Sequence, residues 1–170
     1  MARYNSISNE MEIKLDEGII NLNKIADVTI EFSKSGKKYQ CINFEDSEGI
    51  NGIDFYEVTS LSQSNALYKK EKLKYVRAKQ ATTSYDTKKP ASYKKLITYY
   101  YKNRDDKLVD LSLSKRAIRS NFPNMDTDIL AYIKTNKIKS KSEGDLSKLA
   151  SHIKRLETLI MDRSRLALKN

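Results

Sequence analysis

The hydrophobic period of the chain changes at Ser114, and this change constrains the fold more than any other feature. Upstream, several stretches place apolar residues at every second position, as the Val, Ile and Phe of residues 28–32 do. Downstream, the spacing becomes three and four. Period two is typical of half-buried strands and period 3.6 of amphipathic helices. We therefore predict an α+β fold in one compact domain, with antiparallel β hairpins over 1–113 and a helical part packed on them over 114–170.

Turn residues divide the first part into hairpins. Residues 28–44 form two apolar runs around Gly36, which is free to adopt a positive φ, and residues 11–22 hold a similar pattern around Gly18. Another strand is expected over 53–58. The clearest hairpin is 96–113, whose two apolar runs flank a polar turn. These patterns predict a meander of hairpins.

A further strand is expected from Leu67, followed by a polar loop over 80–92 that contains Pro90. One parity of this strand carries most of the apolar groups, so we expect that face to pack and the lysine-rich face to contact water. The lysine-rich face consists of Tyr68, Lys70, Lys72, Lys74 and Val76.

Three helices are expected after the change of period. Ser114 is placed to cap a short helix over 115–122, Asn124 or Asp126 to cap a second, and Asp145 to open the last. The last helix has apolar residues at spacings of 3, 4, 3 and 4, namely Leu146, Leu149, Ile153, Leu156 and Ile160. This seam predicts packing onto the sheet, with a helix-mediated homodimer as the alternative.

The charge of the chain is distributed unevenly. Residues 1–66 hold 6 Lys/Arg and 11 Asp/Glu, residues 67–107 hold 13 and 4, and residues 108–170 hold 13 and 7, which gives the net charge of +10. The middle segment also contains seven of the eleven tyrosines. Basic side chains interleaved with aromatic rings indicate a surface that faces an anionic or flat partner.

We name residues 67–107 the Tyr/Lys strip and predict that a partner binds there. The residues predicted to contact the partner are Tyr68, Lys69, Lys70, Lys72, Lys74, Arg77, Lys79, Lys94 and Lys95. Of the three tyrosines at 99–101, at least one is expected in the core, because neighbouring strand residues point to opposite faces. A lysine-rich face that only keeps a sheet edge soluble is the alternative interpretation.

No catalytic, cofactor or metal motif accompanies this strip. One Cys and one His cannot assemble a zinc site, and no Gly-rich phosphate loop occurs. Cys41 is expected as a small buried side chain, and His152 as a solvent-facing or loosely packed one. The acidic segment 45–52 is read as a solvated turn, with calcium binding as a weaker alternative because its spacing does not match an EF-hand. We expect a chain that is not an enzyme.

Five stretches follow one another in a fixed order, namely Phe55–Val58 with Leu67–Lys72, the hairpin Tyr99–Lys102 with Asp106–Val109, Leu113–Lys115 with Phe122–Pro123, Ala131–Lys137, and Glu143–Leu149. Together they resemble the C-terminal part of a family of uncharacterised exported proteins of Bacteroidota. The resemblance spans residues 52–157 and implies a periplasmic or outer-membrane-associated protein without a known activity. Members of the family carry a signal peptide, and the start of this sequence shows none. No stretch approaches the ~18 apolar residues of a membrane span.

Two functions compete for the Tyr/Lys strip. The leading hypothesis is a non-catalytic protein of the cell envelope that contacts an acidic protein or an anionic envelope component. The alternative is a cytoplasmic nucleic-acid-binding module that uses the same residues, with lysines on phosphates and tyrosines stacked on bases. Lysine outnumbers arginine eleven to two in the strip, which weakens the alternative because arginine binds bases and phosphates better.

Overall fold

The predicted α+β fold is confirmed. The computed structural model describes residues 2–45, 51–59, 67–81, 85–105 and 107–167, with side chains as far as residue 163. Over these residues, strands β1 to β9 precede helices α1 to α3. Most of the acidic segment that was expected to be a solvated turn lies outside the described residues.

The N-terminal strands form a sheet of their own. β1 (Ala2–Asn5), β2 (Glu10–Leu15) and β3 (Gly18–Asn21) pair antiparallel in the order β1-β2-β3. The expected hairpin at Gly18 is confirmed, and this glycine has a φ of +146°, which L side chains rarely adopt. β1 was not predicted, because its four residues are too short for the period to show.

The second sheet is a six-stranded meander in sequence order. Its strands are β4 (Thr29–Phe32), β5 (Lys37–Glu45), β6 (Asn51–Val58), β7 (Leu67–Val76), β8 (Ser92–Lys102) and β9 (Leu108–Asp110). The expected hairpin over β4 and β5 is confirmed, and Gly36 in its turn has a φ of +67°. Cys41 on β5 is fully buried, as expected.

The three helices are confirmed, with two corrections at their starts. α1 (Lys115–Asn121) begins as predicted, because the Ser114 hydroxyl accepts a hydrogen bond from the Ala117 amide. α2 (Asp126–Thr135) has Met125 at its N-cap, with no side-chain cap, so the predicted caps are wrong. α3 (Glu143–Ala167) begins two residues before Asp145, because Ser142 accepts from the Asp145 amide.

The apolar seam of α3 packs onto the sheet, which confirms the preferred interpretation. Leu149 and Ile153 are fully buried in one cluster with Leu67 and Tyr101 of the sheet and with Leu111, which directly follows β9. Helices α1 and α2 add Ile118, Phe122 and Ile129 to the same cluster. Ile160, at the end of the seam, is exposed. The homodimer through this helix stays a prediction.

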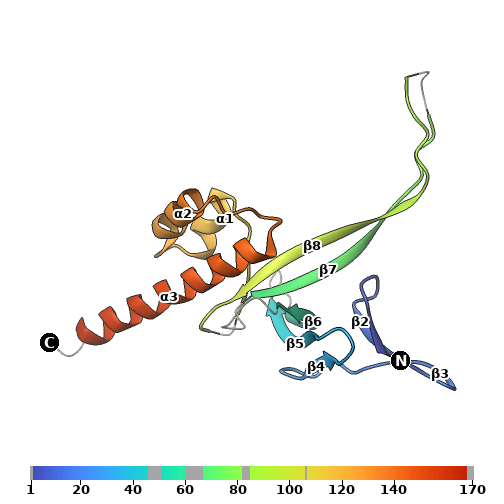
Figure 1. The fold of residues 1–170 in the computed structure, drawn as a ribbon, viewed down its shortest axis with the longest axis horizontal. Coiled ribbons are helices and arrows are strands. Elements are labelled where there is room, and N and C mark those ends of the chain that lie inside the picture. Colours follow the sequence, from blue (N-terminus) through green and yellow to red (C-terminus); the bar gives the residue numbers. More distant parts are fainter. Residues whose placement is uncertain (1, 46–50, 60–66, 82–84, 106, 168–170) are drawn as a thin grey trace. The chain divides into compact units, whose positions relative to one another are not determined.

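The chain forms two compact units that interleave in sequence. The smaller unit contains residues 1–23 and 70–97, and the larger contains residues 24–69 and 98–170. β7 and β8, drawn as a long two-stranded ribbon in Figure 1, have residues in both. The expected division at residue 113 follows secondary structure and stays a prediction.

Candidate functional site

The part of the Tyr/Lys strip that lies in the smaller unit is a basic ribbon, which we define as residues 70–97. It holds nine Lys and Arg and two acidic residues, a net charge of +7. Six of the nine predicted contact residues are exposed and lie in it, namely Lys72, Lys74, Arg77, Lys79, Lys94 and Lys95. The structure therefore brings most of the predicted residues onto one two-stranded element.

The remaining three predicted residues do not belong to an exposed surface. Tyr68 is 2% exposed and its hydroxyl donates to Gln40 Oε1 at 2.8 Å, within a small cluster with Ile42 and Tyr56. Lys70 is 6% exposed. The expectation that the face of Tyr68 and Lys70 contacts water is therefore wrong at this end of β7.

Lys69 is held by two carboxylates in the larger unit. Its Nζ lies 2.9 Å from Glu57 Oε1 and 3.2 Å from Glu143 Oε2, which joins β6, β7 and the first turn of α3. Burial lowers the pKa of Lys69, but the hydrogen bonds and charges of the two carboxylates outweigh this, so its pKa lies above the ordinary value. Lys69 is a structural residue, and its charge is already compensated.

Both faces of the basic ribbon are bare over much of its length. All six residues from Ser92 to Ile97 on β8 are exposed, although neighbouring residues point to opposite faces. β6 pairs with β7 at Lys69 and Tyr68, before the ribbon starts, and within the ribbon the Leu73 amide donates to the Ser6 carbonyl at 3.0 Å. Further out, the amides of Lys79 and Lys89 each donate to the other's carbonyl at 2.9 Å.

Few of the exposed cations of the ribbon are compensated. Lys95 pairs with Glu71 at 2.9 Å and Lys79 with Asp86 at 3.6 Å. Within the described part of the chain, the other exposed cations of the ribbon have no carboxylate within 4.0 Å, namely Lys72, Lys74, Arg77, Lys88, Lys89 and Lys94. Their mutual repulsion is relieved by any anionic surface that approaches.

The tyrosines of the strip divide between the surface and the core. Tyr75 and Tyr93 are 53% and 59% exposed and pack against each other with ring centroids 5.5 Å apart. Tyr85 is almost fully exposed. Tyr101 is buried, which confirms the expectation that one of the three adjacent tyrosines is core. The ribbon thus presents aromatic rings beside its cations.

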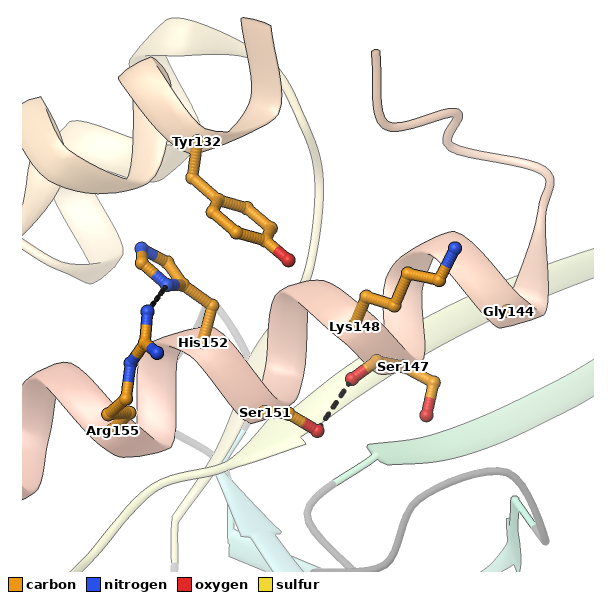
Figure 2. A pocket seen from close by; sticks show the side chains of 7 residues that line it. All are labelled: Tyr132, Gly144, Ser147, Lys148, Ser151, His152 and Arg155. Atoms are coloured by element: carbon orange, nitrogen blue, oxygen red, sulfur yellow. Dashed lines mark hydrogen bonds between the residues drawn. The ribbon is translucent and has the colours of Figure 1, made fainter. Parts of the chain in front are cut away.

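A second candidate surface is a groove between α2 and α3 in the larger unit (Figure 2), with a volume of about 630 Å³. One face of α3 lines it, and Tyr132 of α2 stands opposite. The Tyr132 ring stacks on His152, with centroids 3.9 Å apart and planes 11° apart. Lys148 and Arg155, the cations that line this groove, have no carboxylate within 4.0 Å among the residues with described side chains. The groove can accept a small anion.

The contact with Arg155 and the burial of the ring both favour the neutral form of the stacked histidine. Arg155 Nη2 lies 3.1 Å from His152 Nδ1, and because a guanidinium only donates, Nδ1 accepts and the ring proton resides on Nε2. Nε2 is buried without a hydrogen-bond partner in the part of the chain that the structure describes. Burial and the charge of Arg155 lower the pKa of His152. The prediction of a solvent-facing or loosely packed histidine did not include this stacking. The one signal in the sequence was that the α3 residues of the groove share one helical face.

No metal site or membrane-spanning helix was found in the described ranges. No three His, Cys, Asp or Glu side chains gather there as a metal site requires. None of the helices described is long and apolar enough to cross a bilayer. Comparison with known proteins finds no matching family model, curated protein or solved structure.

Proposed function

We propose that this chain is a non-catalytic binding protein of the cell envelope that contacts an acidic partner through the basic ribbon. The observation that carries the proposal is a set of exposed cations without carboxylate partners on a two-stranded element whose two faces are exposed over residues 74–79 and 92–97. An anionic partner would relieve the repulsion among these cations.

A binding role without chemistry agrees with the state of the histidine. His152 Nδ1 is engaged by Arg155 and its Nε2 is buried, so neither ring nitrogen is placed to exchange a proton with a substrate. Cys41 is fully buried, and burial raises the pKa of its thiol, which disfavours the reactive thiolate. We therefore assign no reaction to the chain. The envelope location rests on the family resemblance.

The test compares two variants of the full chain with equal charge. The ribbon variant carries Lys72→Glu, Lys74→Glu, Lys89→Glu and Lys94→Glu. The control carries Lys115→Glu, Lys139→Glu, Lys141→Glu and Lys154→Glu in the larger unit. All eight lysines are exposed, and each set of four reversals lowers the net charge from +10 to +2.

The probe is poly-L-glutamate, and the measurement is its dissociation constant at low and moderate salt. We expect the ribbon variant to lose affinity by about 100-fold or more at low salt, because each cation near an anionic surface contributes about 1 kcal/mol. The control variant should lose much less. Equal losses would show that net charge alone governs binding and would refute the ribbon as the site.

Nucleic acid is the second candidate partner, and two features of the ribbon favour it. A two-stranded ribbon has the dimensions that the major groove of DNA admits, and exposed rings such as Tyr75 and Tyr85 can stack on unpaired bases. The same two variants separate this function when duplex and single-stranded oligonucleotides replace poly-L-glutamate. Replacing Tyr75 and Tyr85 with Ser should weaken binding to single strands and leave binding to poly-L-glutamate unchanged.

A further inference from the structure

Building on the proposed role of the basic ribbon, we propose that its anionic partner is a phospholipid surface. The smaller unit would contact the lipid headgroups with its cations and the outer acyl region with its exposed apolar side chains. Neither the charge of the ribbon nor its exposed faces identify the partner as a lipid by themselves. A third observation, the location of the exposed apolar residues, points to it.

Exposed large apolar side chains concentrate in the smaller unit. Among the described side chains, ten belong to this unit, namely Ile7, Leu15, Ile19, Ile20, Tyr75, Val76, Tyr85, Tyr93, Leu96 and Ile97. The larger unit, with more than twice as many residues, exposes four, namely Ile25, Val28, Leu159 and Ile160. Apolar surface gathered in one part of a protein marks a site that meets another protein or a membrane.

Cations and apolar groups are close neighbours along both strands of the ribbon. On β8, Lys94 and Lys95 directly precede Leu96 and Ile97, and all four are exposed. Lysine is suited to such a surface, because its four-carbon stem lies along apolar groups while its amine reaches the headgroups. Tyrosine is enriched at the same depth of a bilayer, where its ring and hydroxyl meet different environments.

The choice between lysine and arginine separates a lipid surface from the other anionic partners. Residues 70–97 contain eight lysines and one arginine. Protein interfaces are enriched in arginine and depleted in lysine. Nucleic-acid sites also favour arginine, because its planar fork matches phosphates and bases. A fluid surface of anionic lipids needs point charges without fixed geometry, which lysine supplies.

Vesicle co-sedimentation of the full-length protein tests the lipid proposal. The probes are vesicles of phosphatidylcholine alone and vesicles in which about a quarter of the lipid is phosphatidylglycerol. We expect binding to the anionic vesicles only, with a loss of about 100-fold or more for the ribbon variant and much less for the control variant. Raising the salt should weaken binding.

A fluorescence measurement tests whether apolar side chains enter the lipid. The chain has no tryptophan, so one substitution introduces a unique reporter. Tyr93→Trp places it on the ribbon, and Leu159→Trp places it at an exposed position of α3 as the matched control. On addition of anionic vesicles, emission should shift to shorter wavelength for Tyr93→Trp and stay unchanged for Leu159→Trp.

The outcomes separate the lipid proposal from the binding role on which it rests. Binding of poly-L-glutamate or an oligonucleotide without binding of anionic vesicles would overturn the lipid proposal and leave the ribbon as a binding site. Failure to bind any of these probes would overturn both. Vesicle binding without a wavelength shift for Tyr93→Trp would overturn the lipid contact of the apolar residues, and equal shifts for both reporters would do the same.

Discussion

The two units of this chain use apolar residues in opposite ways. In the larger unit, residues from the sheet and from all three helices form one buried cluster around Ile118, Leu149 and Ile153. In the smaller unit, Met11 is the one buried apolar residue of the described part, and ten large apolar side chains are exposed. Burial of apolar surface is the dominant stabilising term in folding. The larger unit therefore has a core that can sustain its fold, and the smaller unit leaves most of its large apolar side chains exposed.

The two units also differ in whether their lysines have carboxylate partners. In the larger unit, Lys69 is held between Glu57 and Glu143 at the junction of sheet and helix. In the smaller unit, exposed cations such as Lys72, Lys74 and Lys94 have no carboxylate partner within the described residues. A lysine that is compensated inside the fold has a structural role. A lysine that is exposed and uncompensated is available to a partner.

The largest effect should come from the core of the larger unit. Ile153→Ala removes a fully buried side chain that packs in the main cluster. The free energy of unfolding should fall by about 2–5 kcal/mol, since the cavity adds to the lost transfer energy. Urea denaturation followed by circular dichroism measures it. A loss below about 1 kcal/mol would contradict the assignment of the stable core to this unit.

The next largest effect should come from the compensated lysine. Lys69→Met leaves Glu57 and Glu143 partly buried without their cation. We expect the free energy of unfolding to fall by about 1–3 kcal/mol, a range that is discounted for the exposure of Glu143. Lys72→Met, on an exposed residue of the same strand, is the matched control and should change stability by less than about 0.5 kcal/mol. Similar losses of unfolding free energy for both variants would contradict the distinction between compensated and exposed lysines.

A smaller and pH-dependent effect should come from His152. Its folded pKa is lowered by burial and by Arg155, against the opposing charge of Asp128. The stabilisation of the neutral form is therefore fully present above the unfolded pKa of about 6.5 and is lost as pH falls through the lower folded pKa.

The comparison of the wild type with His152→Gln measures this pH dependence. Unfolding free energies are determined for both from neutral to mildly acidic pH, and the wild type should lose more stability on acidification. The other titratable groups are present in both proteins, so their contributions cancel in the difference between the two unfolding free energies. Parallel pH profiles would show that His152 does not titrate in this range.

The smallest effect should come from the exposed apolar residues of the ribbon. Leu96→Ser changes a side chain that is 40% exposed, so stability should change by less than about 0.5 kcal/mol. Binding to anionic vesicles should nevertheless weaken. Urea denaturation and co-sedimentation of the same variant measure both. A stability loss of 2 kcal/mol or more, far beyond the ~0.5 kcal/mol of surface changes, would place Leu96 in a core and contradict the division between the units.

Much of the fold could be predicted because its signals are local. Gly36 and Gly18 mark turns that the structure places at hairpins, and Ser114 caps α1 as its position indicated. The strands and helices follow from the period of their apolar residues. Starts of helices were less predictable, since Met125 precedes α2 without a side-chain cap and Ser142 replaces the expected start at Asp145.

The candidate site was predictable as a segment and less so residue by residue. Alternation along β7 assigned Tyr68 and Lys70 to the water-facing side, but both are buried. Tyr68 is covered by Ile42 and Tyr56, which lie on β5 and β6. The pattern of one strand cannot show that its second face is also covered, because the covering residues come from other strands.

The sequence by itself determined the class of fold, the placement of strands before helices, and the accumulation of positive charge and tyrosine in one segment. These properties depend on neighbours along the chain. Only the tertiary structure decided which lysines are compensated, which tyrosines are buried, and that both faces of the basic ribbon are exposed over residues 74–79 and 92–97. Such properties depend on contacts between residues far apart in sequence, such as Lys69 with Glu143 and Tyr132 with His152. Those contacts exist only after the strands and helices have packed.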